Sequence, residues 1–156
     1  YCMKLAQFKS EIISNKYRDS LVIGADTIVY HNKKILNKPK DENEARKHLN
    51  ELSDSTHVVY TGVSIIIKSK NINISFYDKS YVTFYKLDIH SINYYITNFQ
   101  PYDKAGSYGI QDWSMTFVKK INGCFNNVVG FPIAKFLKLG LDNYQINKII
   151  KNNFIK

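Results

Sequence analysis

The chain is poor in the residues that mark several special classes of protein. It has two cysteines, Cys2 and Cys124, with three prolines and seven glycines in 156 residues. Two cysteines cannot form the framework of a disulfide-rich secreted domain, so we interpret them as reduced thiols. No apolar run approaches the ~18 residues of a membrane span. We therefore expect a cytoplasmic protein with no membrane partner.

Motifs of several common enzyme classes are also absent. The chain has no zinc-ligand spacing, Walker loop, dinucleotide fingerprint or Gly-x-Ser-x-Gly elbow. It contains no internal repeat, low-complexity block or interdomain linker, and 156 residues are enough to build one substantial core. These features predict a single domain over residues 1–156.

The charge balance is strongly basic. Lysine and arginine number 22 against 13 aspartates and glutamates, a formal net charge of +9. Such an excess is typical of proteins that bind nucleic acid or other polyanions. The lysines are spread along the chain, however, and accompany many asparagines, isoleucines and tyrosines, as A/T-rich coding produces. A small anionic substrate would also suit the charge, so a nucleic-acid-binding domain remains an alternative.

The segment 21–30 has an unusual composition for a strand. Residues 21–23 and 28–30 are typical of one buried strand, but Gly24 and Asp26 interrupt it, and both residue types are poor strand formers. Burying an unpaired carboxylate costs on the order of several kcal/mol. We therefore expect Asp26 near a strand end, facing a cation, a metal or backbone donors. The structural alternative is a capping or turn aspartate.

Hydrophobic periodicity predicts the remaining elements. Gly62 indicates either a bulge or a close backbone approach in its strand. The order of elements points to one mixed α/β domain. The expected elements are a helix over 1–14 with Leu5, Phe8 and Ile12 buried, a short strand over 34–36, a helix from Asp41, long strands over 56–68 and 74–86, a helix from Asp88, a strand from Phe117, a turn-like connector at 126–130, a helix from Pro132 to Leu139, and a last helix capped by Asp142 and Gln145 with Ile146, Ile149 and Ile150 inward.

The segment 101–111 is the second unusual stretch. Its glycines, Gly106 and Gly109, stand three apart beside an acid, a lysine and a glutamine. Such a loop can bring backbone amides and a cation close to an anion. Because glycine-containing loops are common, this pattern indicates an anionic ligand and no more.

Segments in consecutive order along the chain resemble the signatures of the Maf family. The opening segment YCMKLAQFK also resembles the family helix that carries a functional lysine, which corresponds to Lys9. The resemblance implies an inosine-triphosphatase-like (Maf/Ham1) α/β fold, a single domain with a mixed sheet. The matching segments are 21–29 (LVIGADTIV), 35–39 (ILNKP), 60–63 (YTGV), 103–111 (DKAGSYGIQ) and 127–132 (NVVGFP).

The resemblance implies a nucleoside triphosphate pyrophosphatase. Such an enzyme cleaves between the α and β phosphates, giving a monophosphate and pyrophosphate, with a divalent metal cation, Mg²⁺ or Mn²⁺. Asp26 would be catalytic, either as the metal ligand or as the group that orients and deprotonates water. Lys9 and Lys38 would neutralise phosphate oxygens as charge moves to the leaving pyrophosphate. Lys104 would bind substrate, unless Asp103 holds its loop instead.

The subclass follows from the loop at 103–111. Its form resembles the members that act on dTTP and UTP. Thr27 and Gln111 are then candidates for reading the base, because an amide can both donate and accept at a pyrimidine edge. The sequence departs from the usual glycine-rich continuation at Asp112 and Trp113. Trp113 could stack on a base, although packing is the commoner use of a single tryptophan.

The resemblance also bears on partners and on completeness. It implies a nucleotide substrate, a homodimer and no specific nucleic acid. Family members begin with a strand, a Ser-x-Ser-Pro-Arg-Arg type loop and an acidic residue associated with the metal, and none of these precedes Tyr1. We therefore expect a domain that is incomplete at its amino end and binds nucleotide weakly. A catalytically impaired, dimer-forming relative is the alternative.

Overall fold

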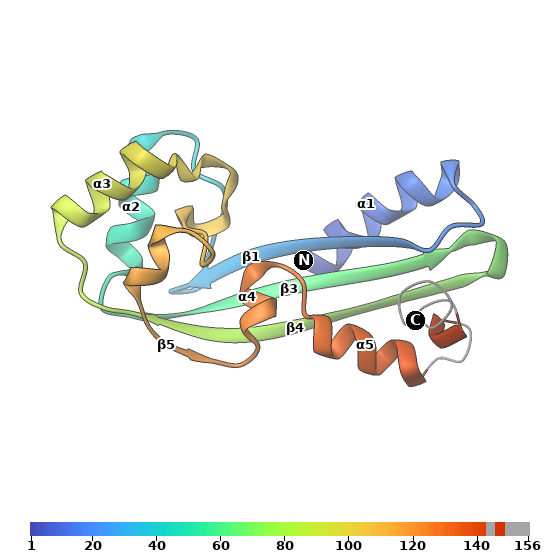
Figure 1. The fold of residues 1–156 in the computed structure, drawn as a ribbon. Coiled ribbons are helices and arrows are strands. Elements are labelled where there is room, and N and C mark those ends of the chain that lie inside the picture. Colours follow the sequence, from blue (N-terminus) through green and yellow to red (C-terminus); the bar gives the residue numbers. More distant parts are fainter. Residues whose placement is uncertain (143–145, 149–156) are drawn as a thin grey trace.

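A long β-sheet with helices on both faces forms the structure, a computed structural model that describes residues 1–142 and 146–148 (Figure 1). The elements, in chain order, are α1 (Cys2–Lys16), β1 (Val22–His31), β2 (Lys34–Leu36), α2 (Glu42–Leu52), β3 (Thr56–Ile67), η1 (Lys68–Lys70), β4 (Ile72–Phe84), α3 (Ile89–Phe99), η2 (Pro101–Asp103), η3 (Ala105–Ser107), η4 (Trp113–Phe117), β5 (Val118–Asn122), α4 (Phe125–Val129) and α5 (Ile133–Asp142).

The strand order across the sheet is β2-β1-β3-β4-β5. Every pairing among these strands is antiparallel. The turn from β1 to β2 is a two-residue hairpin in which Asn32 and Lys33 both have positive φ, as a type I′ turn requires. The α/β class is confirmed. The pairing is wholly antiparallel rather than mixed, because every strand runs against each of its neighbours.

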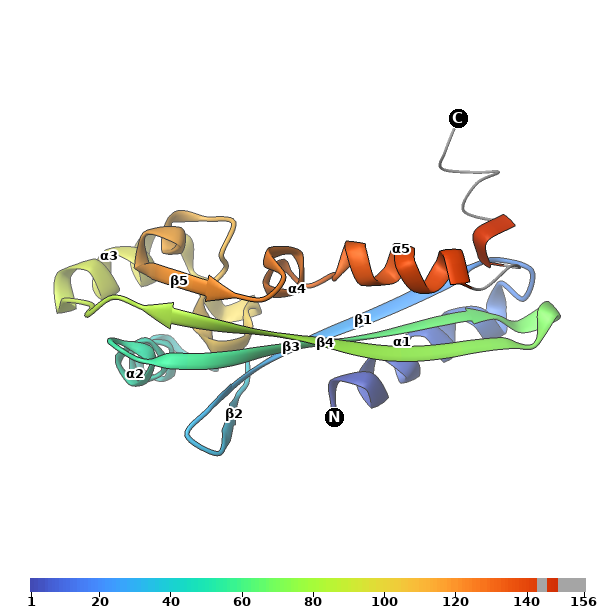
Figure 2. The ribbon, with the colours of Figure 1, turned by 90° about the horizontal axis from the view of Figure 1, so that it is seen from below.

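The core has two parts, one toward each end of the sheet. At one end, α1 and α5 lie on opposite faces (Figure 2). Phe136 of α5 packs there with Val63 and Ile65 of β3. At the other end, α2, α3 and the segment after α3 enclose a cluster that includes Leu49 and Phe84. Each end of the sheet therefore has its own cluster of buried apolar side chains.

Helix α1 lies with its backbone directly against the sheet. A Cβ atom on Gly24 of β1 would lie 2.3 Å from the carbonyl oxygen of Ala6, and one on Gly62 of β3 would lie 2.4 Å from the amide nitrogen of Met3. The close approach expected at Gly62 is confirmed, and the β1–β3 register passes it without a bulge. The buried face of the helix is a stripe of small residues, Cys2, Ala6, Ser10 and Ser14.

The buried stripe expected for this helix was wrong. Phe8 and Ile12 are 62% and 54% exposed, and Leu5 is only half-buried. The reason is the contact with the two strand glycines, since a helix backbone this close to a sheet leaves no room for large side chains between them. The helix therefore turns its small residues inward and its large apolar residues outward.

The helix caps expected at Asp41 and Asp88 are confirmed. The amide of Glu44 donates to Asp41 Oδ1 at 2.8 Å, and the amide of Ser91 donates to Asp88 Oδ1 at 2.9 Å. These bonds satisfy amides that a helix start leaves without partners. Helices α2 and α3 begin directly after the two aspartates, as predicted.

The expected connector at 126–130 was also wrong, because this segment lies mostly in α4. The helix is favoured by Asn127, whose side-chain amide donates to Val59 O at 3.1 Å and to Ser80 Oγ at 3.0 Å. One helical turn points this amide into the sheet, and Gly130, with φ of 120°, ends the helix. Asp142, expected to cap the last helix, lies within α5 instead. Gln145, Ile149 and Ile150 lie outside the described residues, whereas Ile146 is buried as expected.

The packing of α1 makes Gly24→Ala a direct test of the fold. In a strand this change would ordinarily stabilise, because alanine loses less entropy than glycine. Here the new methyl group meets the backbone of Ala6, so α1 must move, and we expect the free energy of unfolding to fall by about 1–3 kcal/mol. Chemical denaturation and hydrogen exchange of the α1 amides measure both effects.

The control is Ile23→Ala, which alters the opposite face of β1 at a side chain that is 40% exposed. This variant should leave exchange of the α1 amides unchanged. A Gly24→Ala protein as stable as the original, with unchanged exchange in α1, would contradict the close contact.

Candidate active site

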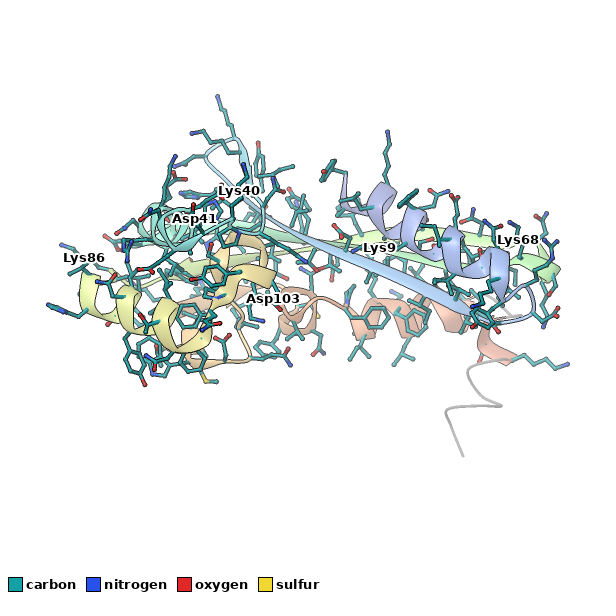
Figure 3. All side chains as sticks on the ribbon, turned by 90° about the horizontal axis from the view of Figure 1, so that it is seen from above. Lys9, Lys40, Asp41, Lys68, Lys86 and Asp103 are labelled. Carbon is teal, nitrogen blue, oxygen red and sulfur yellow. The ribbon has the colours of Figure 1, made fainter. Side chains whose placement is uncertain are left out.

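A cleft of about 550 Å³ opens at the edge of the sheet beside β1. Strand β2 pairs with β1 only at residues 29–31, so residues 22–28 have no strand neighbour on this side in the described part of the chain. Figure 3 shows Lys9 on α1 and Asp103 in the other half of the molecule, with β1 running between them. The cleft therefore lies where the sheet edge is open.

All the site residues predicted from the sequence line this cleft. They come from α1, from β1, from the connection between β2 and α2, and from the loop at 103–111. The fold thus brings together segments that are far apart in the chain. The six residues are Lys9, Asp26, Thr27, Lys38, Lys104 and Gln111.

An ion pair between Lys9 and Asp26 forms the centre of the cleft. Lys9 Nζ lies 2.5 Å from Asp26 Oδ1 and donates to Ala25 O at 3.4 Å. The lysine side chain is 56% exposed and the aspartate side chain 16%. The exposed lysine can thus also contact a ligand through its other N–H donors, while the aspartate is fixed in the wall.

The expected position of Asp26 near a strand end was wrong, although the expected cation is present. Asp26 lies in the middle of β1, opposite Gly62 of β3, which excludes the capping or turn alternative. Its carboxylate projects from the same face of β1 as position 24, the face that carries α1, and therefore reaches Lys9. The absent side chain at Gly62 also lets the start of α1 lie next to this position.

The two glycine amides of the loop at 103–111 bond within the protein, whereas its lysine lines the cleft. The amide of Gly106 donates to Asn37 O at 3.2 Å, and that of Gly109 donates to the hydroxyl of Tyr95 at 3.2 Å. Lys104 Nζ lies 3.4 Å from Asp103 Oδ1, at the cleft wall. A Cβ atom on Gly109 would lie 2.6 Å from Cδ of Lys104, so glycine leaves the space through which this lysine passes.

Two buried histidines hold this loop, and neither was predicted from the sequence. His48 Nδ1 lies 2.8 Å from Ser107 Oγ, and His57 Nε2 lies 2.7 Å from the hydroxyl of Tyr108. Burial lowers the pKa of both histidines, that of His57 to about 3, and raises the pKa of Tyr108. All three groups are therefore neutral near pH 7. His57 lies two residues before Val59 and so on the same face of β3, and this spacing could have identified it as inward.

Trp113 belongs to the fold and not to the cleft wall. Its ring lies 5.0 Å from that of Tyr94 and 5.4 Å from that of Phe117, centroid to centroid. It is not among the residues that line the cleft. The packing alternative for Trp113 is the one supported.

The described residues hold neither a cluster of metal ligands nor a helix that could span a membrane. Within 1–142 and 146–148, no cluster of three or more histidine, cysteine, aspartate or glutamate side chains is placed to hold a metal ion. None of the helices in the same residues combines the length and the apolar composition that crossing a bilayer requires.

An α/β domain whose cleft is lined by three lysines and a fixed carboxylate suits a phosphorylated ligand. The family profile described as Maf-like protein matches residues 1–141. The chain is 46% identical to a dTTP/UTP pyrophosphatase of Bacillus cereus (strain G9842) over 136 residues, which cover 87% of this chain and 70% of the relative. Enzymes of the same name from Bacillus cytotoxicus and Bacillus mycoides are 45% and 44% identical over the same shares. The chain belongs to the Maf family.

The buried His57 gives the stability of the protein a defined pH dependence. A histidine in the unfolded chain takes up a proton near pH 6.5, whereas His57 in the folded protein stays neutral down to about pH 3. Its contribution to stability is complete above pH 6.5 and is lost as the pH falls toward 3. From pH 7 to pH 5 we expect this group to lower the free energy of unfolding by about 2 kcal/mol.

The matched variant is His57→Gln, which keeps a polar partner for Tyr108 but does not titrate. Urea denaturation of both proteins at pH 7 and pH 5 gives the difference. Equal losses in the two proteins between these pH values would show that His57 is not the group responsible.

Proposed function

We propose that this chain hydrolyses nucleoside triphosphates, with dTTP and UTP preferred, to the monophosphate and pyrophosphate. The observation that carries the proposal is the Lys9–Asp26 pair in one cleft with Lys38 and Lys104. The names of the related Bacillus enzymes support the same reaction and substrates. A basic nucleic-acid-binding domain would account for the net charge but gives no role to the fixed carboxylate of Asp26.

The charges of the cleft suit a triphosphate. Three lysines, Lys9, Lys38 and Lys104, line it together with two aspartates, Asp26 and Asp103. The leaving pyrophosphate gains negative charge as the bond to the α phosphorus breaks. Ammonium groups fixed where this charge develops lower the barrier. We assign that role to Lys9 and Lys38, and substrate binding to Lys104.

Asp26 supplies the base in this mechanism. Its Oδ1 is bonded to Lys9, and within the described residues its Oδ2 has no hydrogen bond. The free oxygen can accept a proton from water while the water oxygen bonds to the α phosphorus. The bond from the α phosphorus to the bridging oxygen then breaks, and the electron pair leaves with pyrophosphate. Lys9, paired with Oδ1, holds the carboxylate in position for this step.

A divalent cation is also part of the proposal. Mg²⁺ is usually held by one or two carboxylates together with substrate phosphates. As the alternative to its role as base, Asp26 would hold the cation through this free Oδ2 in a cleft for phosphates. No cluster of three or more candidate ligands is present in the described residues. Bound there, Mg²⁺ or Mn²⁺ would offset phosphate charge and polarise the phosphoryl oxygens.

Location and assembly remain proposals as well. A cytoplasmic enzyme would meet the nucleotide pool. A homodimer would give a use to the exposed large side chains of α1, Phe8 and Ile12, which face away from the sheet.

We predict that Asp26→Asn abolishes hydrolysis and leaves the fold intact. The amide has the shape of the carboxylate but cannot take the proton from water, a loss of about 10²- to 10⁴-fold. Pyrophosphate release from UTP with Mg²⁺ or Mn²⁺ measures it, and circular dichroism monitors folding. Asp103→Asn is the control, since this second cleft aspartate is 76% exposed and should change turnover little. Near-normal turnover by a folded Asp26→Asn protein would remove Asp26 from the site.

We predict that dTTP and UTP are hydrolysed faster than ATP and GTP. Gln111 lines the cleft and is exposed, so its amide is available to a pyrimidine edge. Gln111→Ala should reduce the preference in kcat/KM more than it reduces stability. Gln7→Ala, on α1 and outside the cleft lining, is the control. Purine triphosphates that prove equally good substrates would refute the assignment to dTTP and UTP.

A further inference from the structure

Behind Thr27 runs a short chain of hydrogen bonds that no part of the proposed mechanism uses. Thr27 Oγ1 lies 2.9 Å from Thr61 Oγ1, and Thr61 Oγ1 lies 2.8 Å from the carbonyl oxygen of Asn127. Thr61 is fully buried, whereas Thr27 is half-buried and lines the cleft. This series of hydrogen bonds therefore runs from the cleft wall to the backbone of α4.

The direction of every proton in this chain is fixed by chemistry. A carbonyl oxygen cannot donate, so the bond to Asn127 O must use the single hydroxyl proton of Thr61. Thr61 then has no proton left for Thr27, and the bond between the two hydroxyls must use the proton of Thr27. Thr27 Oγ1 is left with its lone pairs alone.

Asn127, at the end of this series of hydrogen bonds, is held in place by further bonds. The side-chain amide of Asn127 donates to Val59 O and to Ser80 Oγ, and Ser80 Oγ donates to Cys124 O at 2.9 Å. These bonds fix α4 on the sheet. The direction of the hydroxyl protons is therefore a lasting property of the folded protein.

The acceptor of Thr27 is available to a ligand. Within the described residues, its oxygen makes no hydrogen bond besides the one to Thr61. Gly130 lines the same wall, and a Cβ atom added there would lie 3.4 Å from Thr27 Oγ1. Glycine at that position therefore keeps a side chain away from the hydroxyl.

We propose that Thr27 reads an N–H donor on the base and that this makes the cleft favour uracil and thymine over cytosine. The ring position N3 carries a proton in uracil and thymine but only a lone pair in cytosine. With the base in the same position, cytosine would place one acceptor against another, which a buried site penalises. The inference rests on the proposed function in taking a nucleotide as the ligand. Thr61 acts as a positioning residue, because it accepts the Thr27 proton and so keeps the Thr27 oxygen an acceptor.

The decisive variant is Thr61→Val, which nearly keeps the side-chain volume but removes the acceptor for the Thr27 proton. The Thr27 hydroxyl can then rotate and donate to N3 of cytosine. We expect the ratio of kcat/KM for UTP to that for CTP to fall by about three- to tenfold, the worth of one hydrogen bond. Thr61→Ser keeps the hydroxyl, so its ratio should equal that of the original protein.

Two further variants complete the design. Thr27→Val removes the acceptor itself, so it should lower kcat/KM for UTP without improving CTP, and it tests the proposal even if Thr61→Val fails to fold. The matched control is Thr83→Val, because Thr83 and Thr56 form a similar hydroxyl pair at 2.8 Å outside the cleft. The control should leave the ratio unchanged.

Binding of the products UMP and CMP, measured by calorimetry, separates this inference from the proposed function. A protein that hydrolyses no triphosphate but prefers UMP to CMP, with the preference lost in Thr61→Val, would refute the hydrolysis and support the base reading. A protein that hydrolyses UTP, with a ratio unchanged in folded Thr61→Val, would overturn the base reading and leave the hydrolysis standing.

Discussion

The contact between the backbone of α1 and the glycines of β1 and β3 determines the geometry of the site. Gly24 and Gly62 let the helix lie on the strands without side chains between them. At this distance, Lys9 on the helix reaches Asp26 on the strand. A larger residue at either glycine would move the helix, and with it the cation, away from the carboxylate. The chemistry of the cleft thus depends on a packing constraint that involves no charged group.

The rest of the cleft depends on an incomplete sheet edge and on neutral buried anchors. Because β2 is short, the edge of β1 beside Asp26 stays open, and the loop at 103–111 closes over it from the other end. His48 and His57 hold this loop through hydroxyl groups. Neutral anchors suit the position, because a charged group buried beneath the loop would need a partner of its own. The lysines of the wall can then act on the ligand.

Much of the site could be predicted from the sequence, because local motifs carry it. Asp26 in an apolar strand and the glycine-containing loop were recognisable from residue types alone, and the helix starts at Asp41 and Asp88 were recognisable from capping chemistry. The roles of Lys9 and Gln111 came from the family resemblance. The face of α1 could not be predicted, because periodicity assumes that large apolar residues point inward, and the strand glycines reverse this. The Thr61–Asn127 bond joins residues 66 positions apart, and nothing local in the sequence indicates it.

We propose that Lys9 and Asp26 act as one catalytic unit and not as a surface ion pair. A double-mutant cycle tests it most directly, with kcat/KM for UTP measured in Lys9→Ala, Asp26→Asn and the double variant. We expect kcat/KM to fall at least about 100-fold in each single variant. In the double variant it should fall no further than in the worse single one. Single variants with near-normal activity, or losses that multiply in full in the double variant, would contradict it.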